Sequence, residues 1–552
     1  MLILLALIAL AGAAAFAFRA DLRAVAFNLT GEESLTGQVR GLAQLALNIT
    51  RPRPITRPDV AVQHADVNPF GVNTFLHNEV EIAKREQTLR LLADAGFYWV
   101  REQFPWEDIE IHGRGDFIDR RNDPDGVDAW AKYDNIVDLV EQHGMQLIVR
   151  LDNPPSWSRS QPDEVIGSFA PPDDYDDFAR FAAIVAERYR GRVRYFQIWN
   201  EPNIYPEWGE QTVSPEQYTD LLCRAYRAIK EANPDAVVIS GTLAPTSELT
   251  TRDFNDFLFL QRMYDAGAGE CFDILSVQGY GLWSGPTDHR MRPIVINYAR
   301  SQYIRDIMVR NGDAHKAIWI SEMNWNAAPP DVDPRYGRVT LEQQARYAPL
   351  AYQRAEAEWP WVGVVAFWYF KRPDSSWLDE RRPEAYFQMA DPDFNLMPVY
   401  DALKDYIAGA AVMYPGAHAA GHWAVSYGAG WGPSPDPYGG ARAASAGAQG
   451  ISFTFEGSSL AVLLEAAGAG ARVRVDGGPW RELVPGEDRP VWRGRGGRHM
   501  VEIEPLGETI IRQYVVKQAP PLAPAAAGAL FVALAVLSYV LRRRLHRGGA
   551  DG

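Results

Sequence analysis

Between Asn68 and Ile407 the sequence alternates eight times between a short apolar segment and a longer amphipathic one. The short segments are rich in β-branched and aromatic residues, as strands are, and the longer ones carry the periodicity of helices. Eight strand–helix units in succession predict an α/β fold in which a parallel sheet closes into a (β/α)8 barrel. The expected strands are 70–75, 98–103, 145–151, 193–199, 237–241, 274–278, 317–321 and 362–369. The expected helices are 79–95, 129–143, 174–189, 215–232, 255–264, 294–309, 341–358 and 399–407.

The composition changes on either side of the barrel, which we place at 67–410. Residues 21–66 contain a possible short helix around 32–46 and then a stretch rich in Pro and Arg, so we interpret them as a linker. Residues 411–517 begin rich in Gly, Ala and Pro and continue as short alternating runs with a turn at Asp476-Gly477-Gly478. This pattern predicts a small all-β sandwich domain, which either binds carbohydrate or serves as a spacer.

Both ends of the chain are strongly apolar. Residues 1–20 are typical of a signal peptide or an N-terminal membrane anchor, and 522–541 of a transmembrane helix. The tail, 542–552, is basic, and the positive-inside rule predicts that it lies in the cytoplasm. We therefore expect a cell-membrane protein whose large central part lies outside the cell.

Charge and cysteine content exclude several classes of function. A net charge of -15 leaves no basic face for nucleic acid. The two cysteines, Cys223 and Cys271, lack metal-ligand spacing and are too few for a disulfide framework, although they could pair. The acidic run at 173–177 suits the first turn of a helix better than a calcium site. We expect no metal and no cofactor.

Two glutamates occupy corresponding places at the expected strand ends. Glu201 follows the fourth strand and Glu322 follows the seventh, and active sites of such barrels lie at the carboxyl ends of the strands. A pair of carboxyl groups is what hydrolysis of a glycosidic bond requires, since one protonates the leaving oxygen and the other attacks the anomeric carbon. Taken alone, Asn200-Glu201-Pro202 could also be only a turn.

Asn200-Glu201-Pro202 after the fourth strand, together with Ile320-Ser321-Glu322 at the seventh, resembles clan A glycoside hydrolases, most closely families 39 and 5. The resemblance implies a retaining mechanism, with Glu201 as general acid/base and Glu322 as nucleophile. Many members of the clan carry a histidine two residues before the tyrosine of strand six, where this chain has Gln278.

The resemblance also implies substrate-binding roles at four further positions. Asn200 would bond the 2-hydroxyl of the sugar, Arg101 and Tyr280 would hold the nucleophile, and Trp368 would form the floor of the sugar subsite. From the residues alone, Arg101 could instead be a structural ion-pair partner and Trp368 a ring that caps the core.

Asn153 and Trp325 complete the set of candidate substrate-binding residues. Asn153 follows the third strand, and Trp325 lies in the loop after the seventh, where a stacking platform for a sugar would belong. Asn153 could instead shape a turn before the two prolines, and Trp325 could instead pack its own loop.

These observations together predict a membrane-tethered, extracellular retaining glycosidase that cleaves a β-linked glycan. Its partners would be an oligo- or polysaccharide and a membrane, without nucleic acid. A transglycosylase that remodels surface polysaccharide would need the same residues. A carbohydrate-binding scaffold without activity is the alternative from another class, and the presence of both glutamates disfavours it.

Overall fold

The computed structural model describes residues 17–48, 50–433, 441–443 and 447–519. The chain forms two compact units. The first comprises the described chain up to Ala411 together with Gly416–Ser426, and the second comprises Val412–Pro415, residues 427–433 and the described chain from 441 onward.

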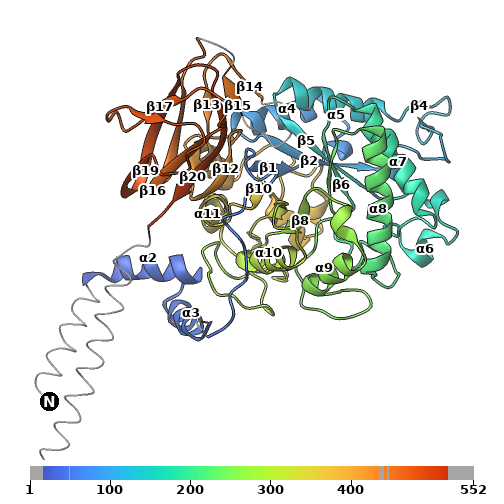
Figure 1. The fold of residues 1–552 in the computed structure, drawn as a ribbon. Coiled ribbons are helices and arrows are strands. Elements are labelled where there is room, and N and C mark those ends of the chain that lie inside the picture. Colours follow the sequence, from blue (N-terminus) through green and yellow to red (C-terminus); the bar gives the residue numbers. More distant parts are fainter. Residues whose placement is uncertain (1–16, 49, 434–440, 444–446, 520–552) are drawn as a thin grey trace, which may run out of the picture. The chain divides into compact units, whose positions relative to one another are not determined.

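The first unit contains the predicted barrel (Figure 1). Its eight strands pair in parallel in the order β7-β6-β5-β2-β1-β10-β9-β8. Isolated parallel bridges Ile239↔Ile274 and Leu243↔Val277 join the two outermost strands, so the ring is nearly closed. The strands are β1 (Phe70–Asn73), β2 (Trp99–Pro105), β5 (Gln146–Asp152), β6 (Tyr195–Ile198), β7 (Val237–Ile239), β8 (Leu275–Gln278), β9 (Ile318–Met323) and β10 (Val362–Phe367).

Each barrel strand is followed by a helix, as the sequence predicts. Their N-terminal caps are visible in the sequence, since Ser214 caps α8 and Thr340 forms a capping box with Gln343 at α11. Asp174 caps α7, so the acidic run at 173–177 serves as a helix start. The helices are α4 (Ile82–Asp94), α5 (Ala131–Gln142), α7 (Tyr175–Arg188), α8 (Pro215–Ala232), α9 (Asp256–Asp265), α10 (Ser301–Arg310), α11 (Leu341–Glu358) and α13 (Pro398–Ile407).

The barrel interior changes character along its axis. At the amino ends of the strands it is filled by three aromatic rings, Trp99, Tyr195 and Trp319, whose centroids lie 4.9 to 5.1 Å apart. Two residues further along β2 and β6 the inward positions are polar, with Arg101 and Gln197, which are buried. The packed floor therefore supports a polar layer at the carboxyl ends.

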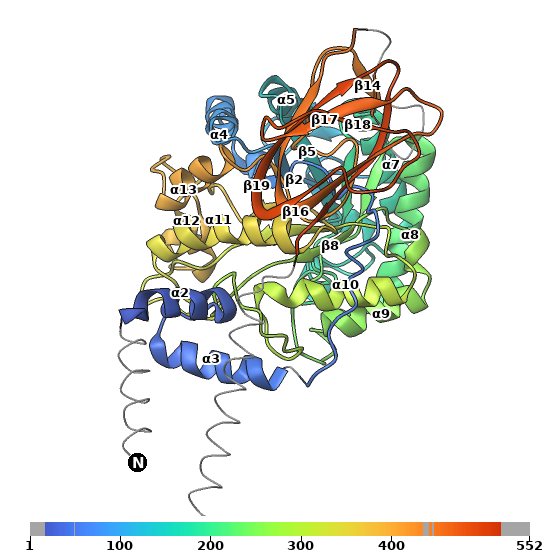
Figure 2. The same cartoon turned by 60° about the vertical axis from the view of Figure 1, so that its left-hand side comes forward.

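Ahead of the barrel lie two helices, α2 (Arg19–Thr30) and α3 (Leu35–Asn48), which form a hairpin (Figures 1 and 2). The helix expected around 32–46 corresponds to α3, whereas α2 was not predicted. The hairpin belongs to the first unit and is joined to the rest of it by buried polar contacts, so an ordered element lies where the sequence predicted a linker.

The second unit is all β. Its strands form one continuous hydrogen-bonded sheet that includes the order β14-β15-β20-β16-β19-β17-β18. The long strands β16 (Ile451–Leu464) and β19 (Trp492–Pro505) pair antiparallel, and side chains along β16 alternate between buried and half-buried. The remaining strands on this path are β14 (Trp431–Pro433), β15 (Ala441–Ala443), β17 (Ala471–Val475), β18 (Arg481–Leu483) and β20 (Ile510–Lys517).

Among the described residues, no helix has both the length and the apolarity needed to cross a membrane. The predicted transmembrane helix, 522–541, and all but the last few residues of the predicted N-terminal segment, 1–20, lie outside the described part of the chain.

The two cysteines are joined in a disulfide. Cys223 lies in α8 and Cys271 lies four residues before β8, with 4.8 Å between their Cα atoms. The sequence leaves this pairing open, and the structure shows that it forms.

Candidate active site

Glu201 is placed by an unusual backbone turn at the end of β6. Trp199 and Glu201 both have positive φ, 78° and 37°, a region that residues other than glycine rarely adopt. The turn is held because the Trp199 ring is buried and its Nε1 donates to the carbonyl of Glu207 at 2.7 Å. Such over-determined strain is typical of functional sites.

Glu322 is placed by a β-bulge. Trp319 and Ser321 on β9 both contact inward-facing residues, so strict alternation would turn Glu322 away from the barrel axis. The register between β8 and β9 shifts after the pair Val277↔Ile320, so that Gln278 pairs with Glu322. A bulge of this kind re-aims a side chain, and here it accompanies the turn of Glu322 toward Arg101 and Tyr280.

Three donors converge on the Glu322 carboxyl group. Arg101 Nη1 donates to Oε1 at 2.9 Å, while Gln278 Nε2 and the Tyr280 hydroxyl donate to Oε2 at 3.0 and 2.8 Å. Gln278 thus fills the position in which the clan often has histidine, and it supplies a hydrogen bond there. This arrangement suits an ionised carboxylate.

Arg101 is held on every side. Its guanidinium also donates to Asn73 Oδ1 at 2.7 Å, Gln197 Oε1 at 2.7 Å and Asn200 Oδ1 at 3.0 Å. The same cation therefore orients both the Glu322 carboxylate and the Asn200 amide. Arg101 is thus both an ion-pair partner within the barrel and a contact of Glu322, so the two interpretations of Arg101 that the sequence left open are compatible.

Glu201 has the electrostatic environment of an acid that keeps its proton. Burial raises its pKa well above the ordinary value, and the negative charges of Glu322 and Glu207 raise it further. Gln278 also hydrogen-bonds Glu201, which opposes the shift, and so does the charge of Arg101. A raised pKa at Glu201, next to a Glu322 carboxyl group that accepts three hydrogen bonds, is a difference of environment that assigns separate roles to a carboxyl pair.

A third carboxyl group, Glu207, lies beside this pair and was not predicted. Burial raises its pKa to about 7, against the opposing charge of Arg150, while Asp152 raises it further and a hydrogen bond with Asn200 lowers it. Glu207 follows Glu201 by six residues in the same loop, and that proximity is the only sequence signal that could have indicated it.

A cleft of about 590 Å³, a size typical of small-ligand sites, is lined by Glu207, whereas Glu201 and Glu322 are not among its lining residues. Asn153 lies in its wall with positive φ, and its Nδ2 is 3.4 Å from Glu107 Oε1. Asn153 thus shapes the loop and also faces the cleft. The lining comprises Phe75, His77, Asn78, Gln103, Pro105, Glu107, Asp108, Ile111, Arg121, Lys132, Arg150, Asn153, Pro155, Ser156, Asp163, Phe169, Glu207 and Arg372.

The two candidate tryptophans have different environments. Trp368 follows β10 directly, is half-buried, and meets the ring of Phe75, which lines the cleft, edge to face at 5.5 Å. Trp325 is fully buried, donates its Nε1 to the Ser284 carbonyl at 2.7 Å and packs against Tyr347. Trp325 therefore packs the loop and is not available as a stacking surface.

Two further aromatic side chains, Phe387 and Tyr336, form a cluster with Tyr280 and were not predicted from the sequence. The Phe387 ring lies 5.5 Å from that of Tyr280 and 5.8 Å from that of Tyr336. Burial raises the pKa of the Tyr336 hydroxyl, and the negative charge of the nearby Glu201 raises it further. These rings come from loops far apart in sequence, so no local pattern brings them together.

Among the described residues, one group has the composition of a metal site. Ligand atoms of Asp66, His418 and His422 lie within 4.8 Å of one another. However, both Asp66 oxygens accept hydrogen bonds, from His418 Nδ1 at 2.8 Å and the Ala419 amide at 2.6 Å, and His422 Nδ1 accepts from Ala424 at 3.1 Å. These atoms are engaged in hydrogen bonds in the structure, and we assign no metal ion to the group.

Comparison with known families agrees with this geometry. Residues 60–289, somewhat less than half of the chain, match the model of the family described as cellulase (glycosyl hydrolase family 5). The matched segment contains Glu201 at the end of β6. The barrel is a clan A glycoside hydrolase. As an enzyme the chain is accordingly an O-glycosyl hydrolase.

Several solved structures are similar to this chain at low sequence identity. A family 39 glycoside hydrolase from Bacteroides cellulosilyticus WH2 is 16% identical, with 83% of each chain covered and a TM-score of 0.46. A family 39 β-xylosidase from Caulobacter crescentus is 15% identical, covering 82% of this chain and 97% of its own, with a TM-score of 0.44. A family 5 enzyme from Streptomyces cattleya, in complex with Manβ1-4GlcNAc, is 16% identical, covering 62% of this chain and 80% of its own, with a TM-score of 0.45. No curated relative matches the sequence.

Proposed function

We propose that the enzyme cleaves a β-linked glycan by double displacement, with Glu322 as nucleophile and Glu201 as general acid and then base. The observation that carries the proposal is the opposite environment of the two carboxyl groups. Glu322 accepts from Arg101, Gln278 and Tyr280, whereas burial and neighbouring negative charge raise the pKa of Glu201.

In the first step the Glu322 carboxylate attacks the anomeric carbon while Glu201 gives its proton to the departing glycosidic oxygen. The product is a glycosyl ester on Glu322, and the negative charge that had raised the pKa of Glu201 is then neutralised. Glu201, now ionised, takes a proton from a water molecule as that water attacks the anomeric carbon, and the bond between this carbon and the Glu322 carboxylate oxygen breaks. The proton returned to Glu201 and the freed Glu322 restore the starting state.

Azide rescue with activated aryl β-glycosides tests both roles. Replacing the nucleophile (Glu322→Ala) should lower kcat by about 10⁴-fold or more, as loss of a catalytic nucleophile does, and azide should restore turnover with a glycosyl azide of inverted configuration. Replacing the acid/base (Glu201→Ala) should cost about 10²- to 10⁴-fold, and azide should yield the retained configuration.

Glu342→Ala provides the matched control, because Glu342 is an exposed glutamate in the first turn of α11. It should behave as the unsubstituted enzyme. Undiminished hydrolysis by Glu322→Ala, or azide products of the same configuration from both catalytic variants, would contradict the assignment.

We also propose that the enzyme is tethered to the cell membrane with its barrel outside. Two features support this location: the apolar segments at both ends of the sequence, the second followed by Arg542-Arg543-Arg544, and the Cys223–Cys271 disulfide, since such bonds persist in oxidising compartments. Proteolysis of intact cells tests it. Loss of the barrel to an external protease would support the topology, and protection that ends only on lysis would refute it.

A further inference from the structure

The α2–α3 hairpin exposes a stripe of large apolar side chains on each helix. On both helices the members are spaced at i, i+4 and i+7, which places them on one face. Their side chains are between 39% and 62% exposed. The stripes consist of Phe18, Leu22 and Val25 at α2, and Leu35, Val39 and Leu42 on α3.

This exposure is concentrated in the hairpin. With Leu47, the 31 residues from Phe18 to Asn48 hold seven of the 23 exposed large apolar side chains found in the described part of the chain. Single exposed apolar residues are ordinary in a soluble surface, but two ordered rows in one short segment are not. The pattern indicates a surface that is covered in use.

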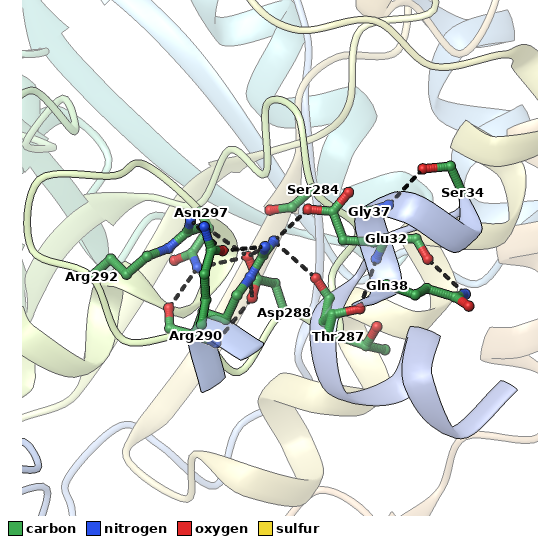
Figure 3. A network of polar contacts seen from close by, with 12 residues as sticks. Glu32, Ser34, Gly37, Gln38, Ser284, Thr287, Asp288, Arg290, Arg292 and Asn297 are labelled. Carbon is green, nitrogen blue, oxygen red and sulfur yellow. Dashed lines mark hydrogen bonds and ion pairs between the residues drawn. The ribbon is translucent and has the colours of Figure 1, made fainter. Parts of the chain in front are cut away.

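The opposite side of the hairpin is fixed to the loop between β8 and α10 (Figure 3). Arg290, which is buried, donates to both oxygens of Asp288 at 2.7 and 2.9 Å. The same guanidinium donates to Glu32 Oε1 at 2.8 Å, the Thr30 carbonyl at 3.0 Å and Gln44 Oε1 at 2.9 Å. A guanidinium shared in this way orders both helices against the loop.

Backbone contacts lock the turn of the hairpin as well. Gly285 donates its amide to the Gly31 carbonyl at 2.8 Å, and the Thr287 hydroxyl donates to the Phe27 carbonyl at 2.6 Å. Gly31 has a φ of 65°, and a Cβ there would lie 2.6 Å from the Gly285 oxygen, so no other residue fits. The apolar stripes therefore belong to a docked element whose position relative to the barrel loop is set.

We propose that the hairpin is an in-plane membrane foot, whose apolar stripes insert among the lipid headgroups of a bilayer and thereby fix the orientation of the barrel at that surface. The sequence argues for lipid as the occupant, because Phe18 is both the last residue of the apolar run Leu2–Phe18 and the first residue of the α2 stripe. Chain leaving a membrane segment would thus continue directly into the stripe. Amphipathic helices with such a face lie in the interface of a bilayer.

The loop that holds the hairpin also reaches the active site. The loop that holds Arg290 begins directly after β8, and its Tyr280 donates to Glu322. One loop therefore connects the membrane-binding element to the catalytic carboxylate, so the mouth of the barrel would be presented at a defined attitude to glycans close to the membrane. This inference rests on the proposed membrane location and not on the catalytic roles.

Fluorescence quenching in vesicles of phosphatidylcholine tests the foot in the full chain. Val25→Cys and Val39→Cys place a thiol-reactive bimane in each stripe, and the native cysteines do not react because they are paired. Val165→Cys in α6 (Asp163–Ile166) is the matched control, since Val165 is 59% exposed against 55% for Val25 and 62% for Val39. Spin-labelled lipid should quench about half of the emission at both stripes and roughly a tenth at the control, unchanged by high salt because the contact is apolar.

Each other outcome overturns the proposal in a recognisable way. Stripe labels that iodide quenches from the water, on a chain anchored in the vesicles, would overturn the foot and leave the tether intact. Labels shielded from both quenchers would show that a second copy of the chain or another protein covers the stripes. A chain that stays in solution would overturn both the foot and the tether, while azide rescue would still report on catalysis.

Discussion

Arg101 on β2 and Glu322 on β9 are joined by a hydrogen bond of 2.9 Å, and both side chains are buried. The partners of Arg101 include Asn200, the neighbour of Glu201, so one guanidinium links the sequence positions that carry both proposed catalytic groups. Removing half of such a buried pair leaves an uncompensated charge, which is costly for the fold as well as for the chemistry. The cost to the fold is measured as a lower Tm, and the cost to the chemistry as a change in kinetics.

Replacing Arg101 should therefore change the pH profile and not only the amount of activity. Arg101→Met should lower kcat/KM by about 10²- to 10³-fold, as loss of a preorganised donor does. The charge of Arg101 lowers the pKa of Glu201, so its removal should raise that pKa further, and the alkaline limb of the profile should move to higher pH. Arg300→Met is the control, because Arg300 is a buried arginine outside the site that forms an ion pair of 2.5 Å with Asp256. This variant should lower Tm without moving that limb.

Glu207 should set the alkaline limb. Its negative charge contributes to the raised pKa of Glu201, so Glu207→Gln should lower that pKa. Glu201 would then lose its proton at lower pH, and the alkaline limb of kcat/KM should move to lower pH. The effect should appear above pH 7, where Glu207 is itself ionised, because its own pKa is raised to about 7.

Glu107→Gln is the control for this shift, since Glu107 also lines the cleft and burial raises its pKa, but it is not among the main influences on Glu201. An alkaline limb that moves equally in both variants would indicate a general effect of charge in the cleft. Because the carboxyl groups interact, the limbs report apparent values of the set.

Trp368 and Trp325 should respond oppositely to truncation. Trp368→Ala should raise KM for glycans and leave Tm nearly unchanged, because the ring is half-buried beside Phe75 at the cleft. Trp325→Ala should cost about 3–5 kcal/mol of stability, since it leaves a cavity in the core and an unpaired Ser284 carbonyl. Thermal unfolding and steady-state kinetics on both variants separate the roles, and a large loss of stability in Trp368→Ala would contradict this division.

Elements whose own sequence determines them were predictable. Helices 215–232 and 341–358 have the expected bounds, and the capping residues Ser214 and Thr340 mark where they begin. The eight strands are apolar runs bounded by turns. The strand positions then brought Glu201, Glu322, Arg101, Asn200 and Tyr280 to one end of the barrel.

What depends on contacts distant in sequence was not predictable. The bulge at Glu322 is a matter of register between β8 and β9, and the approach of Glu207 to Arg150 depends on how one loop folds. Trp325 has the same local sequence whether it faces the cleft or the core. Helix α2 follows an apolar run directly, so its start lies within a segment that was assigned to the membrane signal.

The Cys223–Cys271 disulfide should contribute to stability without affecting catalysis. It closes a loop of 48 residues, and the chain-entropy relation gives about 4 kcal/mol for a loop of that length. For a unit of this size that corresponds to a fall in Tm of about 5 °C on reduction. Differential scanning calorimetry with and without reductant measures it, and the double variant Cys223→Ala/Cys271→Ala should show the same fall and no further response to reductant. Neither cysteine lines the cleft, so kcat/KM at 25 °C should stay the same. A Tm that does not change on addition of reductant would mean that the bond is absent in the protein as it is made.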